Sequence, residues 1–237
     1  MTTFVETEKQ YRAVITRDPG IVRECQELRQ RVFSTEFAAE SDADEFDEVC
    51  EHLAVLNEGE VVGTYRMLLP GSSNRLYSEG EFTLDALAPL RPELVETGRS
   101  CVHPEHRSGA VINLMWSTMG RYVRAAGYRH LAGCASVSLA DGGAAAGTTW
   151  RLTREKHFAP AELRVAPRQP WIPRQRTDGR TTYAGIPPLL RGYLRLGAWV
   201  CGPPSHDPEF DCADFFTLLS FDQVGPRYRR YFFGDGE

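Results

Sequence analysis

The chain has 237 residues, of which 42% are hydrophobic and 25% charged, and its formal net charge is −5 at pH 7. This composition is typical of a soluble globular protein and excludes a protein that binds nucleic acid through bulk positive charge. Its six cysteines are irregularly spaced, and the charged N-terminal segment lacks an apolar run, so neither a disulfide framework nor a signal peptide is expected. We expect one cytoplasmic domain over residues 1–237, with peripheral contact at the inner face of the membrane left open.

The first half of the chain alternates short strands with one helix. Residues 11–16 predict a strand, residues 21–37 a helix with apolar side chains at helical spacing, and residues 40–48 an acidic segment. Two apolar runs at 52–57 and 61–69 flank a Gly-containing turn and predict a hairpin. A loop at 70–81 and a central strand at 94–99 follow.

The second half contains the clearest helix, over residues 109–127, because its apolar side chains follow a helical period. A strand at 130–137, a helix at 139–157, a Pro- and Arg-rich stretch at 160–188 and a short helix at 189–196 come next. Strands at 198–202 and 214–220 precede a basic, aromatic tail at 227–233. Such alternation predicts a mixed α/β sheet flanked by helices in one domain.

The stretch from residue 95 to residue 109 is the most informative. It places Glu96 and Arg99 on a strand and then a Gly-containing loop before the long helix. A loop that enters a helix N-terminus can hold an anion, and a carboxylate beside it can take a proton from an amine. The alternative for the loop is a plain helix start, capped by Ser108 and eased by Gly109.

Three charged side chains lie in predicted strands and are expected to pair with opposite charges. Glu96 and Arg99 are three residues apart, so on an ideal strand they face opposite sides, and a bulge between them, at Gly98, could bring both to one face. The alternative interpretation is an ordinary surface ion pair of small energetic value. Arg66 is a lone charge in an apolar strand, and a carboxylate of the acidic segment is its expected partner.

A metal site and a cysteine nucleophile are both disfavoured. His103 and His106 have a metal-ligand spacing, but Pro104 interrupts the helix that would align them. Cys101 lies beside the expected site without a His–Asn or His–Asp partner motif, and we expect it to be a buried structural residue.

These motifs together resemble a known family. The order Arg29/Arg31–Val32–Phe33, Asp44-x-x-Asp47, Tyr65–Arg66-x-Leu68–Leu69 and Glu96-x-x-Arg99 is similar to the acyl-homoserine-lactone synthases, and more similar to the ornithine-lipid N-acyltransferases of the GNAT superfamily. The second choice rests on the blocks at 96–104, 131–137, 188–198, 207–210 and 214–216. The resemblance implies an α/β (α+β) GNAT-like fold with a mixed, mostly antiparallel central sheet flanked by helices.

The resemblance also implies roles for individual residues. Glu96 and Arg99 would be catalytic. The substrate-binding residues would be Asp44, Asp47, Arg66, Arg31 and Phe33. The donor-binding residues would be Cys101, Val102, Arg107, Ser108, Gly109 and Ala110. No metal and no permanently bound cofactor are expected.

The implied reaction joins a fatty acyl chain to the α-amino group of an amino acid. Its donor is an acyl carrier protein phosphopantetheine thioester or acyl-CoA; the loop at 107–112 departs from the usual GNAT pyrophosphate loop and favours the carrier protein. The acceptor stays open among ornithine, lysine, glycine and glutamine. The alternatives are an acyl-homoserine-lactone-type signal synthase that uses S-adenosylmethionine and a non-catalytic acyl- or acyl-carrier-binding protein.

Two basic segments suggest partners. Residues 164–195 carry seven arginines against one acidic residue, Asp178, with Glu162 just before them, so they either dock the acidic carrier protein or form a solvated loop. For the docking interpretation, Arg174→Glu with Arg176→Glu is expected to raise the KM for the carrier protein. The basic tail at 227–233 could instead touch anionic lipid.

Overall fold

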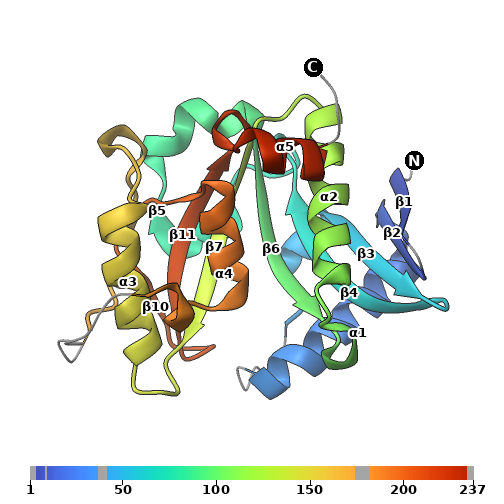
Figure 1. Cartoon of the computed structure of the whole chain (residues 1–237), viewed down its shortest axis with the longest axis horizontal. Helices are drawn as coiled ribbons and strands as arrows, with labels where there is room; N and C mark the ends of the chain where they lie inside the picture. Colours follow the sequence, from blue (N-terminus) through green and yellow to red (C-terminus); the bar gives the residue numbers. More distant parts are fainter. Residues whose placement is uncertain (1–3, 9, 37–41, 174–181, 234–237) are drawn as a thin grey trace. The chain divides into compact units, whose positions relative to one another are not determined.

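The computed structural model describes residues 4–8, 10–36, 42–173 and 182–233 (Figure 1). The chain divides into two compact units. Unit 1 comprises Met1–Asn74, Glu93–Arg129 and Pro226–Glu237, and unit 2 comprises Arg75–Pro92 and His130–Gly225. The expectation of one domain over residues 1–237 stays a prediction.

Unit 1 contains five antiparallel strands, each paired with the next in the order β1-β2-β3-β4-β6. Their bounds are β1 (Phe4–Glu8), β2 (Tyr11–Thr16), β3 (Glu51–Asn57), β4 (Glu60–Leu68) and β6 (Leu94–Val102). The predicted strand at 11–16 and the predicted hairpin are confirmed. The strand β1 was missed because its sequence is mostly polar and its pairing with β2 is what fixes it.

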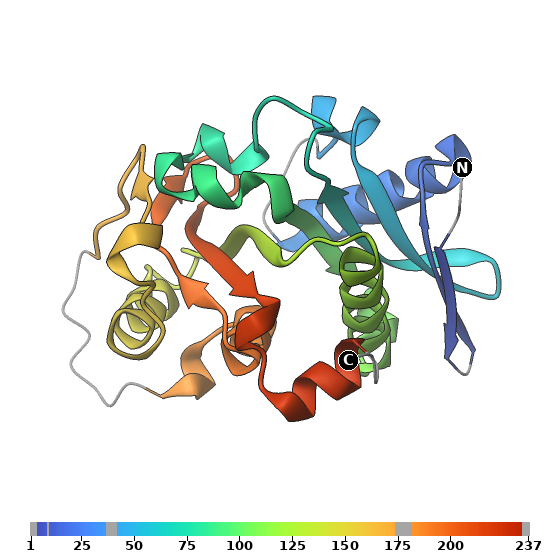
Figure 2. The same ribbon diagram turned by 90° about the horizontal axis from the view of Figure 1, so that it is seen from above.

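Helices cover both faces of this sheet. Figure 2 shows α1 (Pro19–Glu36) and α2 (Ala110–Ala125) on opposite sides of the strands. Gly63 of β4 lies under α2, where a Cβ atom would come within 2.7 Å of Val111 and 3.1 Å of Met115. The next residue along, Thr64, points to the other face, toward Cys25 of α1. A third helix, α5 (Pro226–Phe233), packs on α2.

In unit 2, β7 (His130–Ser138), β11 (Cys212–Ser220) and β10 (Ser205–Asp207) are neighbouring strands, and β9 (Trp199–Val200) pairs with β11. The strands β5 (Phe82–Thr83) and β8 (Ala166–Pro167) form a separate ribbon. All strand pairs registered within the two units are antiparallel, in agreement with the predicted mostly antiparallel sheet.

The helices of unit 2 are α3 (Ala144–Lys156) and α4 (Pro188–Leu196). Helix α3 begins five residues later than predicted, because Gly142 and Gly143 adopt positive φ angles of 77° and 84°. The Asp141 carboxylate then accepts hydrogen bonds from the first helical N–H groups, as an N-terminal cap does.

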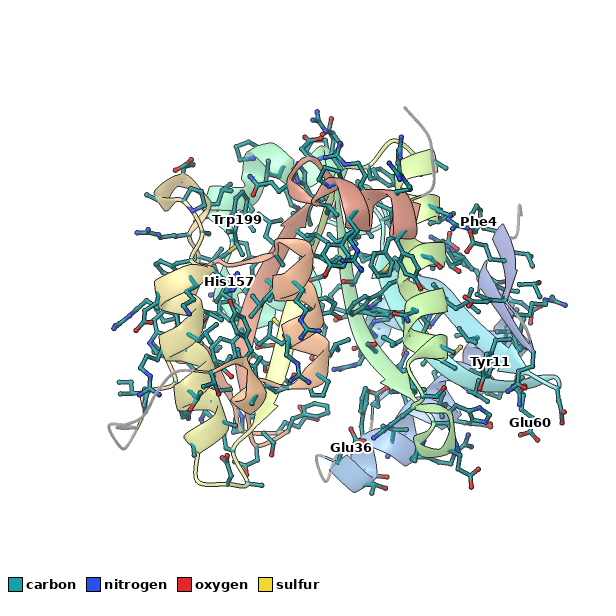
Figure 3. The ribbon with its side chains drawn as sticks, viewed as in Figure 1. Phe4, Tyr11, Glu36, Glu60, His157 and Trp199 are labelled. Carbon is teal, nitrogen blue, oxygen red and sulfur yellow. The ribbon has the colours of Figure 1, made fainter. Side chains whose placement is uncertain are left out.

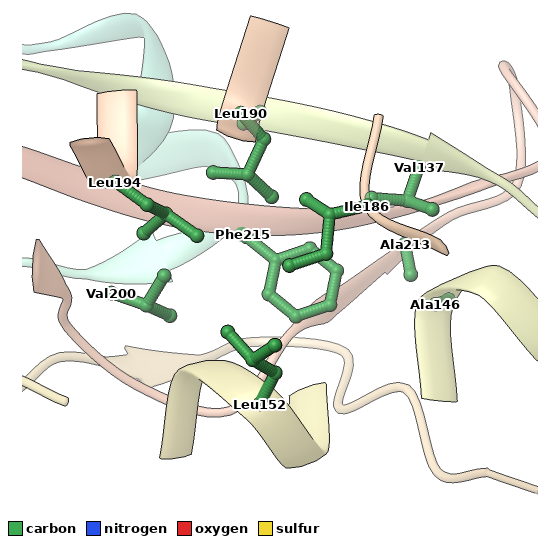
Figure 4. Packing of buried hydrophobic residues seen from close by; sticks show 10 residues of the cluster. Val137, Ala146, Leu152, Ile186, Leu190, Leu194, Val200, Ala213 and Phe215 are labelled. Atoms are coloured by element: carbon green, nitrogen blue, oxygen red, sulfur yellow. The ribbon is translucent and has the colours of Figure 1, made fainter. Parts of the chain in front are cut away.

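A hydrophobic cluster joins these helices to the strands of unit 2 (Figure 4). Leu152 of α3, Leu190 and Leu194 of α4, and Phe215 of β11 are all buried and point toward one another. Seven short 3-10 segments complete the secondary structure: η1 (Glu45–Glu48), η2 (Tyr77–Gly80), η3 (Asp85–Glu93), η4 (Pro104–His106), η5 (Ala161–Leu163), η6 (Tyr183–Gly185) and η7 (Phe221–Gln223). Among the described helices, none is long and apolar enough to cross a membrane.

Candidate functional site

A buried arginine of α1 organises the acidic segment of unit 1. The Arg29 side chain is fully buried, and its Nε donates to Asp42. Its two terminal nitrogens donate to the Asp47 carboxylate at 2.8 and 2.9 Å. A buried guanidinium needs such partners, and its planar fork matches two carboxylates well.

Two strand arginines contact the same acidic segment. Arg66 of β4 donates to Asp44 at 2.6 Å and to Asp47 at 3.1 Å, which confirms the expected partner for the lone charge in the apolar strand. Arg99 of β6 lies 3.0 Å from Asp42 and 3.3 Å from Asp44. Each arginine therefore bridges two aspartates.

These contacts close into a loop of six alternating charges, which we call the charge ring. In order around the ring, its members are Arg29, Asp42, Arg99, Asp44, Arg66 and Asp47. Three positive and three negative charges give the ring no formal net charge. The ring ties α1, the acidic turn η1, β4 and β6 to one another.

Supporting contacts hold the acidic turn in place. Asp44 caps η1 by accepting from the Phe46 N–H at 2.9 Å. His52, fully buried on β3 and opposite Arg66 in the β3–β4 register, hydrogen-bonds the Asp47 carbonyl oxygen through Nε2 at 3.0 Å. Because that carbonyl can only accept, Nε2 carries the proton. Burial lowers the pKa of His52 below its ordinary value, so the imidazole is neutral.

The ring controls the ionisation of Asp47. Burial alone would raise the pKa of this carboxyl, but the hydrogen bonds and charge of Arg29 and the charge of Arg66 outweigh it and hold the pKa well below its usual range. The Asp47 carboxylate is therefore negative at all ordinary pH values.

Glu96 lies on the same face of the sheet as Arg66. It is 5% exposed, and it pairs with Leu68 in a register that sets Gly98 opposite Arg66. Burial raises the pKa of the nearby Cys50 thiol to about 12, where the Arg66 charge lowers it and the Glu96 charge raises it. Glu96 therefore lies on the same buried sheet face as Arg66 of the charge ring.

The expected bulge is present on β6. Between the pairs Thr64–Cys101 and Arg66–Gly98, β6 holds one residue more than β4. The extra residue falls at Arg99–Ser100 rather than at Gly98, and Arg99 has a positive φ of 53°. This bulge is what turns the Arg99 side chain toward the face that carries Arg66.

The bulge is followed by two residues whose N–H groups point in opposite directions. The His103 N–H donates to the Val62 carbonyl of β4 at 2.8 Å, so by alternation the Cys101 N–H also faces β4 and the Val102 N–H faces the other edge of β6. The Cys101 side chain is buried and burial raises the pKa of its thiol. Cys101 is thus structural, as expected, and Val102 offers the outward amide.

The loop before α2 differs from a simple capped helix start. Gly109 is the N-cap with a φ of 91°, and no side chain caps the helix, so the alternative with Ser108 as cap is wrong. Arg107 donates to the Val102 carbonyl at 3.0 Å and pairs with Glu36 at 2.5 Å; Glu36, at the end of α1, is labelled in Figure 3. The loop cation is therefore held by α1 and β6.

The remaining predicted binding residues lie outside the charge ring. Arg31 is exposed on α1, two residues and about half a turn away from the buried Arg29, and Phe33 belongs to the hydrophobic core. His106 hydrogen-bonds Tyr11 at 3.0 Å. The structure therefore selects Arg29, of the two arginines in the motif, as the one that joins the cluster.

Sequence reasoning missed three members of this site: Arg29 as a ring member, Asp42 and His52. Arg29 sits on the apolar face of its helix, next to Leu28 and Val32, and that position was the available signal. Nothing in the sequence distinguishes Asp42 from its acidic neighbours. His52 looks like an ordinary strand residue until the register places it opposite Arg66.

A separate group of possible metal ligands lies in unit 2. Ligand atoms of Asp207, Cys212 and Asp214 lie within 4.8 Å of one another. Ser136 and Cys212 donate to the two Asp214 oxygens at 2.6 and 3.4 Å, and burial raises the pKa of this carboxyl. The polar atoms satisfy one another, so we assign no metal here.

Comparison with protein families and curated proteins gives consistent results. Residues 28–117 match the acetyltransferase (GNAT) domain family. The L-ornithine N(alpha)-acyltransferase of Brucella abortus is 31% identical over 89% of this chain and 84% of that protein. The enzyme of the same name from Rhodobacter capsulatus is 30% identical over 94% of each.

Solved structures share the fold at low identity. The CoA-dependent acyl-homoserine lactone synthase BjaI superposes with a TM-score of 0.54 at 15% identity, covering 95% of this chain and 85% of that one. FeeM, an N-acyl amino acid synthase from uncultured soil microbes, also gives 0.54, at 11% identity over 90% and 96% of the two chains.

Proposed function

Because this chain belongs to the L-ornithine N(alpha)-acyltransferase family and is therefore an N-acyltransferase, we propose that its acceptor is ornithine and its product a lyso-aminolipid. The relatives of that name cover most of the chain. The observation that carries the proposal within the structure is the buried Glu96 beside a charge ring able to bind a zwitterion.

Glu96 is the proposed general base. The α-amino group arrives as an ammonium and must lose a proton before it attacks the thioester carbonyl, and a carboxylate can accept that proton directly or through a water. The nitrogen then bonds to the carbonyl carbon, and the tetrahedral intermediate expels the thiolate. A thiol of pKa about 8.5 leaves with little acid assistance.

The Val102 amide is the proposed oxyanion donor. A backbone N–H aimed at the developing negative oxygen stabilises the intermediate at no reorganisation cost. Of the amides of the donor-binding residues Cys101 and Val102, that of Cys101 faces β4, so we assign the role to the Val102 amide, which faces away from β4. Arg66 and Arg99 would bind the acceptor carboxylate, and Asp44 and Asp47 its cationic groups.

The proposed donor is an acyl carrier protein thioester. A CoA donor brings a pyrophosphate that needs cations and free amides at the loop before α2. The loop at 107–112 departs from the usual GNAT pyrophosphate loop. The carrier protein has no such pyrophosphate, and its acidic surface suits the arginine-rich segment. In that segment Arg164, Arg168 and Arg195 are exposed, whereas Arg174, Arg176 and Arg180 lie outside the described residues.

Contact with the inner face of the membrane is also proposed, through α5. Arg227, Arg229 and Arg230 are exposed there, and Tyr231 is 56% exposed. Phe232 anchors the helix on Trp116 of α2, with ring centroids 5.8 Å apart. Basic and aromatic side chains on one short helix suit an anionic lipid surface that receives an acylated product.

The decisive experiment mixes the protein with acyl carrier protein or CoA thioesters and a panel of amino acids, and identifies products by mass spectrometry. Formation of acyl-ornithine from the acyl carrier protein thioester supports both the proposed acceptor and the proposed donor. Product from S-adenosylmethionine would indicate a signal synthase, and thioester binding without product would indicate a binding protein. Glu96→Gln should lower the acylation rate about 10²–10⁴-fold. Glu93→Gln, an exposed glutamate on the same segment, is the matched control and should leave the rate unchanged.

A further inference from the structure

The charge ring has one edge that is partly exposed to solvent. The side chains of Arg29, Asp42, Asp47 and Arg66 are at most 5% exposed. Asp44 and Arg99 are 23% and 16% exposed, and the contact that joins them, at 3.3 Å, is the longest one measured in the ring. The Arg99–Asp44 contact is thus the one link with both partners accessible.

The links of the ring differ in how readily they can open. Separating a buried pair leaves a charge in a medium that cannot solvate it, which is strongly unfavourable. Opening a partly exposed pair costs less, because water can solvate the separated charges. When the exposed link opens, Arg99 keeps Asp42 and Asp44 keeps Arg66. A ligand can therefore replace this link while the rest of the ring stays closed.

The ligand that fits an opened ion pair carries one charge of each sign. A carboxylate replaces Asp44 as the partner of Arg99, and an ammonium replaces Arg99 as the partner of Asp44. An α-amino acid with a cationic side chain has both groups and still leaves its α-amino group for reaction. We propose that Arg99 binds the α-carboxylate of the acceptor and that Asp44 binds its side-chain ammonium, so that this edge selects a diamino acid.

This inference rests on the proposed function and narrows it. Arg66 and Asp47 then position Asp44 and Arg99 rather than contact the acceptor, because each is buried and already paired with two partners within the ring. Asp44 then decides between cationic and neutral side chains, and Arg99 decides between amino acids and simple amines. The two residues are specificity determinants with separable effects.

A panel of three acceptors separates the two roles. Ornithine carries both groups, norvaline lacks the side-chain ammonium and putrescine lacks the carboxylate. Asp44→Asn should raise the KM for ornithine roughly 10–100-fold, as the loss of a charge-assisted hydrogen bond does, and should abolish the preference over norvaline. Arg99→Gln should raise the KM for ornithine and norvaline by a similar factor and should reduce the preference for both over putrescine.

The variants are chosen so that the fold survives. Asn keeps the side-chain oxygen that accepts from the Phe46 N–H at the start of η1, and thermal melts verify that each variant is folded. Glu48→Gln, an exposed acid in the same turn, and Arg12→Gln, an exposed arginine on β2, are controls that should leave every KM unchanged.

Calorimetric titration with ornithine and norvaline measures the affinity of the Arg99–Asp44 edge for each acceptor without turnover. Tight binding of ornithine that Asp44→Asn reduces to the norvaline level supports the inference even if no acyl product forms, in which case only the proposed function fails. An unaltered preference for ornithine in folded Asp44→Asn, by KM or by binding, would overturn the inference while leaving an observed acylation of ornithine intact.

Discussion

Replacing Arg29 with Met tests whether the charge ring stabilises unit 1. Methionine keeps much of the apolar stem but removes the guanidinium, which donates to both Asp42 and Asp47 and is fully buried. The three carboxylates of the ring then share the two remaining arginines, which leaves one negative charge uncompensated. Breaking a buried pair from one side costs about 3–5 kcal/mol. For a chain of this size, that loss lowers Tm by about 6–20 °C.

The measurement is urea unfolding at pH 7, checked by calorimetry. Arg31→Met, on the exposed face of the same helix, is the control and should change the free energy of unfolding by less than about 0.5 kcal/mol. The native pKa of Asp47 lies below its unfolded value, so its stabilising contribution is complete above that value and is lost as pH falls through the native pKa. Arg29→Met should flatten this acid limb. A loss below about 1 kcal/mol would refute the reasoning.

Three further predictions follow from single positions. Gly63→Ala should destabilise by about 1–3 kcal/mol in calorimetry, because the added Cβ would lie 2.7 Å from Val111. Burial lowers the pKa of His52 from 6.5, so its contribution to stability is complete above that pH and falls as pH drops toward the native pKa; urea midpoints of His52→Gln should lose this dependence. Iodoacetamide at pH 8 should modify the half-buried Cys134 well before Cys101, whose thiol pKa is raised by burial, as peptide mass spectrometry would show.

Each of these has its own check. Gly80→Ala meets no atom within 4 Å and should leave the melting temperature near that of the parent protein. Nitrogen-15 spectra should show His52 protonated only on Nε2 at pH 7. A positively charged imidazolium, protonated on both nitrogens at that pH, would contradict the assignment. Modification of Cys101 at the rate of Cys134 in folded protein would mean that β6 opens readily.

The sequence predicted the larger elements of unit 1 because their patterns are local. The hairpin followed from two apolar runs around Gly59, and the helix α2 from its period. The short strands β5, β8 and β10 were missed because two or three residues carry no periodic signal. Helix α5 was seen only as a basic tail, since its fold depends on the packing of Phe232 against Trp116.

The site was predictable in its parts but not in its connections. Spacing alone led to a bulge near Gly98 and to an acidic partner for Arg66, because both follow from strand alternation and from the cost of a buried charge. Arg29 rather than Arg31 belongs to the charge ring because of which face of α1 packs on the sheet. The closure of the ring depends on the register of β4 with β6, which sequence periodicity does not determine.

The closed ring also constrains how this sequence can change over generations. Each buried member of the charge ring contacts two side chains of opposite charge. Replacing one member with a neutral residue therefore leaves one uncompensated charge in the interior. A tolerated route therefore exchanges an arginine and an aspartate together, or begins at Asp44 or Arg99, where water can solvate the odd charge. Relatives that have lost one of the four buried members should have lost a second, and the two lost should be neighbours around the ring.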